Sequence, residues 1–306
     1  MFSGKIILVI IVILAVVAAL YFLAIMPRLF GKPAKEPFLG RLYAHRGLHD
    51  NRSDAPENSM KAFRLAVEAG YGIELDVQLS KDGVPVVFHD FTLARVARYP
   101  KGREPQDAIQ NADGSLGVKG KVCDYTFSEL QKFYLMDSEE QIPTFENFLK
   151  LVNGKVPLVI ELKIEFTDLS VCRKADCLLR EYRGAYCIES FNPLGLFWYR
   201  RNHSEIMRGQ LSDAFHKEDP VAFRGPVYFA LTNLLLNFMT KPDFVAYNYR
   251  YADNLSRRLC RDLYHNTAAA WTIRDQKALE ESRKNFDIFI FDSFIPKEET
   301  SERADA

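Results

Sequence analysis

Short apolar runs of strand length recur along most of the chain, separated by segments whose apolar residues follow the spacing of an amphipathic helix. A strand followed by a helix is the repeating unit of a parallel sheet. The runs that we assign to this sheet are 42–46, 72–79, 157–163, 185–190, 206–211, 244–248, 268–273 and 287–292. Eight parallel strands that alternate with helices close into a (β/α)8 (TIM) barrel, so the pattern predicts an α/β protein with this fold.

A ninth apolar run, 84–89, follows the second strand after the short segment 80–83. Because so short a turn does not allow a parallel crossover, we predict an antiparallel hairpin. The next stretch, 91–124, has no clear periodicity and contains several Gly and Pro residues. We expect a loop region inserted after the second strand and lying over the mouth of the barrel.

Two helix-like segments can be outlined in more detail. Ser59 can cap the first helix of the barrel and Gly70 can end it, with one apolar stripe between them. The apolar stretch 227–239 is too short and too interrupted by Asn to span a bilayer. We expect it to be a buried helix of the outer shell; the alternative is an apolar lip that faces a membrane.

The amino-terminal segment differs from the rest of the chain. Residues 6–26 contain no charged side chain and, at about 1.5 Å per residue, are long enough to cross a hydrocarbon layer of about 30 Å. A cleaved signal peptide is the alternative, but its apolar core is usually only about 7 to 15 residues long. We therefore predict a transmembrane anchor over 1–27, a linker over 28–40 that holds the domain off the bilayer, and a catalytic domain over 41–306.

The charges that flank this segment do not decide its orientation. Lys5 precedes it, whereas Arg28, Lys32 and Lys35 follow it, and the more positive side normally stays cytoplasmic. By that count the domain faces inward, but so short an amino-terminal tail is compatible with export. We therefore predict a single-pass membrane protein and leave open on which side of the membrane its domain lies.

Composition excludes some classes of function. The chain has 40 basic and 40 acidic residues in 306, so it lacks the positive charge typical of nucleic-acid-binding proteins. Its five Cys residues are an odd number without a Cys-x-x-Cys pair, which argues against a disulfide framework and a structural zinc site. A hydrophobic content of 48% is enough for one barrel-sized core.

Two carboxylates in the second predicted strand indicate a metal site. Glu74 and Asp76 point to the same face, because side chains alternate along a strand. Two like charges so close together favour a divalent cation between them. Oxygen ligands suit Mg²⁺ or Ca²⁺ better than Zn²⁺, so we predict one of these two ions as the cofactor.

Two histidines and an arginine lie at neighbouring strand ends. His45 and His89 each follow an apolar run, at the carboxyl end where barrel enzymes gather their chemistry. Two imidazoles beside a metal form an acid and base pair, and we predict these residues to be catalytic. Arg46 offers a fork of donors that matches the oxygens of a phosphate.

Three other strands contribute candidates. Glu161 and Lys163 alternate on one strand after an apolar run, and we name Glu161 as the third metal ligand. Trp271 can line a substrate pocket, although packing alone would explain it. Glu57 begins a helix and either complements the helix dipole or orients a neighbour in the site.

These residues resemble the glycerophosphodiester phosphodiesterase family. The matching motifs are His45-Arg46-Gly47, Pro56-Glu57-Asn58-Ser59, Glu74-Leu75-Asp76-Val77, Lys81-Asp82-Gly83, Pro85-Val86-Val87, His89-Asp90, Ile142-Pro143-Thr144-Phe145, Ile160-Glu161-Leu162-Lys163, Glu189-Ser190-Phe191-Asn192-Pro193 and Ala270-Trp271-Thr272-Ile273. The resemblance implies metal-dependent hydrolysis of a glycerophosphodiester to glycerol 3-phosphate and an alcohol on a TIM barrel. It also implies that Glu74, Asp76 and Glu161 are metal ligands and that Arg46 and Lys163 bind phosphate.

Two departures from the family pattern concern substrate choice. Arg274 stands where the family usually has Asn, and the chain reads Phe291-Asp292-Ser293-Phe294-Ile295-Pro296 where the family usually closes with Thr-Asp-x-Pro. Two alternatives to glycerophosphodiester hydrolysis remain. One is a lysophospholipase D that acts on membrane lysophospholipids, and the other is an inactive, membrane-tethered phosphodiester-binding module.

Overall fold

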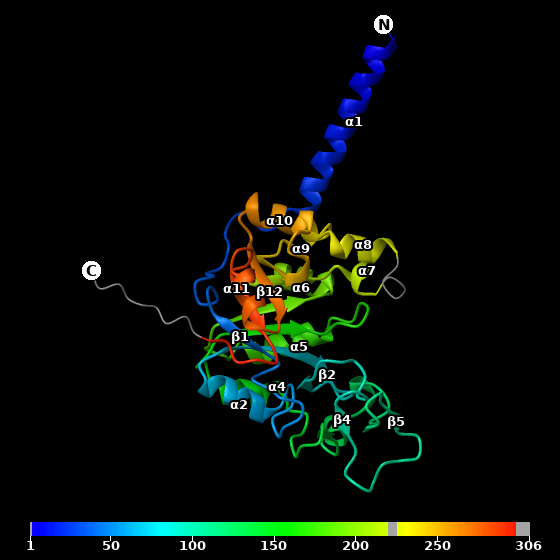
Figure 1. The fold of residues 1–306 in the computed structure, drawn as a ribbon, viewed down its shortest axis with the longest axis vertical. Helices are drawn as coiled ribbons and strands as arrows, with labels where there is room; N and C mark the ends of the chain where they lie inside the picture. The colour runs from blue at the N-terminus through cyan, green and yellow to red at the C-terminus, as the bar shows by residue number, and fades with distance from the viewer. Residues whose placement is uncertain (1, 220–224, 298–306) are drawn as a thin grey trace, which may run out of the picture.

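The computed structural model describes residues 2–219 and 225–297, and its centre is a closed barrel of eight parallel strands (Figure 1). The first and second strands pair with each other and so close the ring, which confirms the predicted TIM barrel. The barrel strands are β1 (Leu42–His45), β2 (Gly72–Leu79), β8 (Leu158–Leu162), β9 (Tyr186–Ser190), β10 (Arg208–Ser212), β11 (Phe244–Asn248), β12 (Thr267–Ile273) and β13 (Ile288–Phe291).

Helices follow most of these strands and cover the outside of the barrel. They are α2 (Met60–Glu68), α4 (Phe145–Val152), α5 (Ser170–Leu179), α6 (Pro193–Asn202), α10 (Leu255–Asp262) and α11 (Gln276–Ser282), with the short α3 (Phe127–Leu130), α7 (Phe215–Glu218), η1 (Val122–Asp124) and η2 (Tyr249–Tyr251). The Ser59 side chain accepts a hydrogen bond from the Ala62 amide, as predicted for a cap of α2. Gly70 follows the end of α2 with φ +74°, a left-handed conformation that glycine adopts without strain.

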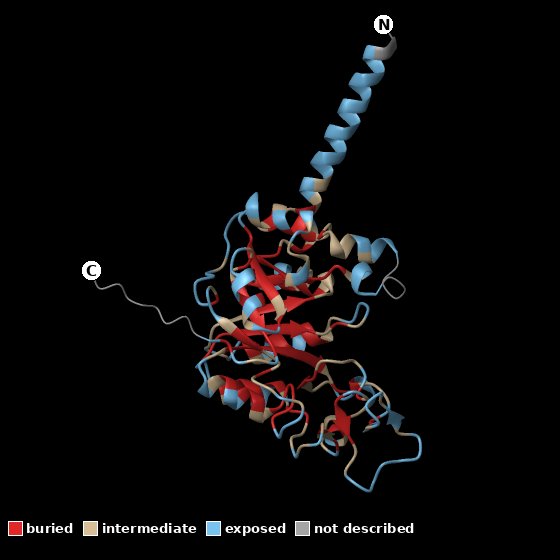
Figure 2. Cartoon of the chain, in the orientation of Figure 1, coloured by how far each residue is buried: buried red, intermediate tan, exposed pale blue. Residues whose placement is uncertain are grey.

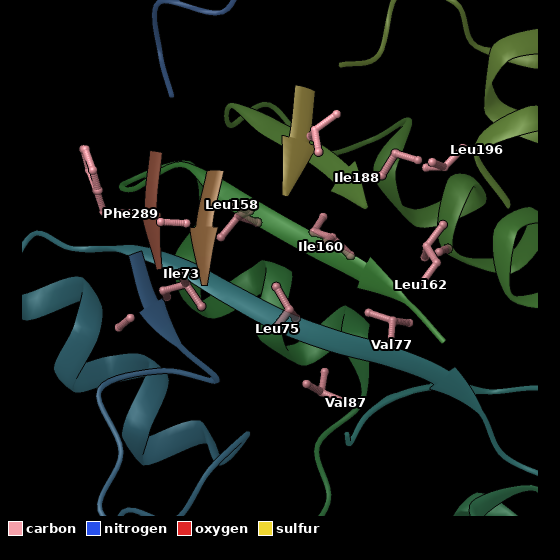
Figure 3. Close-up of a cluster of buried hydrophobic side chains, with 14 of the residues drawn as sticks. Ile73, Leu75, Val77, Val87, Leu158, Ile160, Leu162, Ile188, Leu196 and Phe289 are labelled. Atoms are coloured by element: carbon pink, nitrogen blue, oxygen red, sulfur yellow. The ribbon is translucent and has the colours of Figure 1, made fainter. Parts of the chain in front are cut away.

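Alternation along the strands separates two hydrophobic layers. Figure 3 shows Ile73, Leu75 and Val77 of β2 beside Leu158, Ile160 and Leu162 of β8, all within the layer between the barrel and its helices. The strands are buried along most of their length (Figure 2). The opposite side chains of the same strands therefore point into the barrel, and this set includes the predicted carboxylates.

The predicted hairpin is confirmed, but the insertion after it is more ordered than we expected. β3 (Pro85–Val87) pairs antiparallel with β2. The next residues form β4 (Ala97–Arg98), β5 (Ile109–Gln110) and β6 (Leu116–Gly117), which join β7 (Tyr134–Leu135) in a separate four-stranded sheet. This sheet has its own small core and lies at the end of the molecule far from the amino terminus (Figure 1).

The segment 227–239 does not form the buried helix that we predicted. It is divided between α8 (Pro226–Thr232) and α9 (Asn237–Thr240), with Leu234 at a left-handed φ of 55° between them. Val227 and Phe229 on α8 are 63% and 64% exposed, whereas Leu234 is buried. Only some of the apolar side chains of this segment are therefore packed in the core.

Helix α1 (Phe2–Ile25) projects from the barrel, and its shaft makes no contact with the domain until its last turns (Figure 1). The stretch Gly4–Ile25 has the length and hydropathy needed to cross a membrane. Cys172, Cys187 and Cys260 are buried free thiols, as expected, whereas Cys123 and Cys177 are exposed.

Gly209 provides a test of how tightly the barrel interior is packed. A Cβ atom at this position would lie 2.1 Å from the ring of Phe244, a fully buried residue opposite it on β11. We expect Gly209→Ala to lower the free energy of unfolding by about 1 to 3 kcal/mol through overpacking, measured by thermal or urea unfolding in detergent. The double variant with Phe244→Leu should lose less than the sum of the two single variants, since the smaller side chain leaves room. Strict additivity would contradict this packing account.

Candidate active site

A pocket of about 440 Å³ opens at the carboxyl ends of the barrel strands. The predicted residues that line it are His45, Arg46, Glu74, His89, Glu161, Lys163 and Trp271. Asp76 lies just beneath, with 1% of its surface exposed, and Glu57 is also buried. Of the residues that the structure describes, none between 91 and 124 lines this pocket, so the insertion does not form its wall as we had expected.

Strand register places the acidic side chains side by side. Asp76 on β2 is the register partner of Glu161 on β8, and Glu161 is in turn the partner of Glu189 on β9. Register partners on parallel strands point to the same face, so the three carboxylates lie in one row inside the barrel. Glu74 faces the same interior two residues earlier on β2 and is the partner of His45 on β1.

Burial makes this row electrostatically unfavourable without a cation. The pKa values of Glu74 and Glu189 are raised well above the usual range, first by burial and then by the neighbouring carboxylates. Burial also raises the pKa of Glu161, although Lys163 acts against it. For Asp76, the charges of His89, Lys163 and Arg46 outweigh burial and lower the pKa.

The structure brings together a set of ligand atoms that can hold a cation. One ligand atom each from Asp76, His89 and Glu161 lies within 4.8 Å of the others. Glu74 is outside this group; its Oε2 accepts a hydrogen bond from the Arg46 amide at 3.1 Å and lies 3.9 Å from Nε2 of His45. Two of the three predicted carboxylate ligands therefore converge, and a histidine predicted to be catalytic joins them.

Two buried oxygens fit the presence of a cation. Within the described parts of the chain, Asp76 Oδ1 and Glu189 Oε2 have no hydrogen-bond partner. Lys163 Nζ lies 3.5 Å from Asp76 Oδ1 and 2.9 Å from Glu161 Oε1, so a lysine partly neutralises the row. Carboxylate oxygens with unused acceptor capacity are the donor type that hard divalent ions bind.

An aspartate holds the first histidine. His45 Nδ1 lies 3.2 Å from Asp292 Oδ2, and His49 Nε2 lies 3.2 Å from the other oxygen of the same carboxylate. Burial lowers the pKa of His45 to about 4, assisted by the charge of Arg46 and opposed by the hydrogen bond to Asp292. His45 is therefore neutral at physiological pH and can accept a proton on the ring nitrogen that faces the pocket.

The second histidine is held in a similar way. His89 Nδ1 is 2.5 Å from Oδ1 of Asp90, and the Asp90 carboxylate also accepts hydrogen bonds from Arg95. The hydrogen bond to Asp90 holds the ring, and a ring nitrogen of His89 lies within 4.8 Å of carboxylate oxygens of Asp76 and Glu161. Both imidazoles thus have a carboxylate partner.

Arg46 is fixed by acids around the pocket. Its Nη1 donates to Glu57 Oε1 at 2.8 Å, and its Nε lies 3.6 Å from Asp76 Oδ2. Arg95 binds both oxygens of Glu57 at 2.7 Å. Glu57 therefore contacts Arg46 directly, as a residue that orients a neighbour in the site would.

Trp271 lies at the wall of the pocket. Its ring packs edge-on against Phe191 at a centroid distance of 5.6 Å. The buried Nε1 atom has no hydrogen-bond partner among the described residues. An aromatic wall with an available donor is consistent with the predicted contact to substrate, beside the packing role.

Comparison with known proteins identifies the family. A family model described as glycerophosphoryl diester phosphodiesterase matches residues 45–292. The chain belongs to this family. The matched span begins at His45 and ends at Asp292, the two residues that share a hydrogen bond across the closure of the barrel.

Individual relatives agree with this assignment. A glycerophosphodiester phosphodiesterase of Bacillus altitudinis is 35% identical over 41% of this chain and 45% of its own length, and human glycerophosphodiester phosphodiesterase 1 is 31% identical over 39% and 33%. The chain thus matches about half or less of the length of these curated relatives. An Oleispira antarctica phosphodiesterase, solved with sn-glycerol-3-phosphate, shares the fold with a TM-score of 0.60 and 22% identity over 83% of this chain and 92% of its own.

Several residues of the site were not predicted from the sequence. They are Asp292 beside His45, Asn58 whose Nδ2 donates to Asp76 Oδ2 at 3.0 Å, Arg95 on Glu57, and Glu189 in the acidic row. Glu189 had a usable signal, because it lies near the end of a predicted strand within a motif of the glycerophosphoryl diester phosphodiesterase family. The local sequence around Arg95 carries no such signal, since its partner Glu57 lies 38 residues away in the chain.

The arginine pair around Glu57 predicts a dependence of stability on pH. Burial alone would raise the pKa of Glu57, but Arg95 and Arg46 outweigh it and lower the pKa to about 2. Because the unfolded chain binds this proton near pH 4.5, the stabilisation is complete above that pH and is lost as the pH falls toward 2. We expect Glu57→Gln to remove about 3 kcal/mol of pH-dependent stability over this window, measured by urea unfolding between pH 2 and 6.

A matched control is available on the surface. Glu146→Gln changes an exposed glutamate whose ion-pair partner among the described residues is Lys150 in the same helix, so it should leave the slope of stability against pH nearly unchanged. Equal slopes for the parent protein and Glu57→Gln would show that the arginine pair does not stabilise the ionised carboxylate.

Proposed function

We propose that this protein hydrolyses glycerophosphodiesters to sn-glycerol 3-phosphate and an alcohol with the help of a divalent cation. The observation that carries the proposal is the buried acidic row at the carboxyl end of the barrel, flanked by two imidazoles and by two cationic side chains. Family membership supports the reaction class. The Oleispira antarctica relative of the same fold was solved with sn-glycerol-3-phosphate, the predicted product.

Asp76 and Glu161 are the ligands that the geometry favours for the cation, and Glu74 is the third that the family motif implies. Mg²⁺ or Ca²⁺ fits this set, since its donors are mainly carboxylate oxygens. When bound, such an ion neutralises phosphate oxygens and lowers the pKa of an attacking hydroxyl. Burial and the neighbouring carboxylates raise the pKa values of Glu74 and Glu161, and a positive charge in the site relieves both effects.

The side chains then have distinct roles in this proposal. His45, neutral and held by Asp292, removes the proton of the attacking hydroxyl, which belongs either to water or to the glycerol of the substrate. Attack by the glycerol hydroxyl expels the alcohol and forms a cyclic phosphate, which water then opens to glycerol 3-phosphate. His89, held by Asp90, protonates the leaving alcohol. Arg46 and Lys163 stabilise the negative charge that grows on the phosphate oxygens, and Trp271 contacts the glycerol or the head group.

We also propose that α1 is retained as a single-pass membrane anchor and is not a cleaved signal. Ile25, the last residue of α1, is completely buried in the barrel core, and its carbonyl accepts a hydrogen bond from Asn237. A segment destined for removal has no reason to complete the core of the mature domain. The predicted membrane location rests on this observation together with the length of the helix.

The first test of the function is turnover of glycerophosphocholine by the full-length protein, with and without a chelator. We expect activity that requires added Mg²⁺ or Ca²⁺ and that falls by at least about 10²-fold in His45→Ala, since a general base contributes about that much. His265→Asn, at an exposed position away from the pocket, is the matched control and should retain activity. Full activity in EDTA, or in His45→Ala, would refute the mechanism.

The second test concerns the carboxylate that positions His45. Asp292→Asn keeps the size of the side chain but removes the charge beside both His45 and His49. We expect kcat to fall by about 10- to 100-fold with little change in KM, because the residue orients a catalytic group and lies away from the substrate. An unchanged kcat would mean that the contact is only structural.

A further inference from the structure

We infer that the barrel sits directly on the membrane through the surface around the base of α1, which is formed by α9, α10 and the segments that precede β10, β11 and β12, with the pocket mouth turned toward the aqueous phase. This inference goes beyond the proposed hydrolysis, and it rests on the proposal that α1 is a retained anchor. The partner surface is a phospholipid bilayer. Three observations carry the argument: the rigid docking of α1, the length of helix that remains free, and the side chains that surround its base.

The last turns of α1 are bound to the domain. The Tyr21 hydroxyl lies 2.8 Å from Ser256 Oγ, and the Tyr264 hydroxyl donates to the Phe22 carbonyl at 2.9 Å. Further along, Asn237 Nδ2 donates to the Ile25 carbonyl at 3.0 Å. Contacts that begin at Tyr21 leave the helix no hinge between the membrane and the barrel.

The segment after α1 is also attached to the barrel, contrary to the predicted linker that holds the domain off the bilayer. The Arg28 amide donates to the Pro242 carbonyl, and its Nη1 donates to the Ser204 carbonyl at 2.7 Å. Phe38 is 3% exposed, and the Gly40 amide donates to the Asp287 carbonyl. Residues 28–40 therefore run along the domain and do not act as a spacer.

The length of α1 then determines how close the domain must be. Residues 2–20, which precede the docked turns, form about 28 Å of helix at 1.5 Å per residue. The hydrocarbon layer is about 30 Å thick. The free part of the helix can span the hydrocarbon layer only if the docked turns lie at the membrane boundary. The barrel surface next to these turns then lies in the membrane interface.

Exposed apolar side chains surround these docked turns. Leu255 is 60% exposed and precedes Ser256, Leu263 is 52% exposed and precedes Tyr264, and Phe238 is 51% exposed and follows Asn237. Each is therefore a chain neighbour of a residue that holds α1. Figure 1 shows α9 and α10, which carry or adjoin these residues, at the base of α1.

The same face carries basic side chains. Arg258 is exposed on α10 between Leu255 and Leu263, and Lys32 follows the base of α1 with its Nζ near the His265 carbonyl. Arg200 reaches the Phe238 and Met239 carbonyls of α9. Apolar side chains interspersed with lysine and arginine suit the interface of a membrane that contains anionic lipid.

The pocket lies at the other end of the barrel. The segment after α1 binds Ser204, Pro242 and His265, which come shortly before β10, β11 and β12 and so mark the amino-terminal face. The pocket opens where the parallel strands end. A substrate therefore enters from the aqueous phase, which favours water-soluble glycerophosphodiesters over lysophospholipids held in the bilayer.

Spin-label accessibility in the full-length protein tests this arrangement. Single Cys residues replace Leu255, Leu263, Phe166 or Leu14 in a Cys123→Ser, Cys177→Ser background, and the labelled protein is reconstituted into phosphatidylcholine and phosphatidylserine vesicles. Collisions with oxygen report on the membrane, and collisions with a water-soluble nickel chelate report on the aqueous phase. Phe166 is the matched control, since it is 80% exposed and apolar but follows the carboxyl end of β8.

We expect oxygen-accessible labels at positions 14, 255 and 263 and a nickel-accessible label at position 166. The seated arrangement would be overturned if the label at position 14 lies in the membrane but the labels at 255 and 263 are as accessible to nickel as the label at 166. A membrane-located label at 166 would overturn the direction of the mouth, and a nickel-accessible label at 14 would refute the anchor on which the inference rests.

A substrate comparison with the same vesicles tests the consequence for catalysis. We expect kcat/KM for glycerophosphocholine to exceed that for bilayer-held lysophosphatidylcholine by at least about tenfold, and a preference for the lysolipid would overturn the inference. Absence of turnover with either substrate would instead refute the proposed function, and the spin-label result would still stand by itself.

Discussion

The repulsion among buried carboxylates is the constraint on which the site depends. Glu74, Asp76, Glu161 and Glu189 project into one barrel interior that excludes most water. Such a row is tolerated only with compensating positive charge, and Lys163 and Arg46 supply part of it. The raised pKa values of the glutamates show that the compensation is incomplete, which is the physical basis for placing a divalent cation there.

A surrounding set of contacts keeps this charged centre in place. Asp292 and Asp90 each hold a histidine, and Glu57 holds Arg46 with the help of Arg95. These partners come from the loops that follow different strands, so the site forms only when the barrel closes. Stability and the proposed catalysis are therefore linked through the same ion pairs.

The two ends of the barrel have different tasks. The carboxyl ends of the strands carry the polar pocket, whereas the amino ends accept the last turns of α1 and the segment after it. A parallel barrel separates these two faces by the length of its strands. In the arrangement that we propose, this separation lets a membrane-anchored domain act on soluble substrates.

The sequence by itself determined the elements and the facing of their side chains. Strand periodicity located the eight barrel strands and the β2–β3 hairpin, and the alternation along β2 paired Glu74 with Asp76 on one face. The cap that Ser59 forms on α2 was also predicted from the sequence. These features follow from interactions within a few residues, which a local pattern records.

Only the tertiary structure decided which distant residues meet. Asp292 reaches His45 because β13 closes the ring against β1, and Arg95 reaches Glu57 from an insertion whose fold has no periodic signal. The division of 227–239 into two short helices and the attachment of residues 28–40 to the barrel likewise depend on packing partners far along the chain. The local pattern does not contain these contacts, because their geometry is set by strand order and barrel closure.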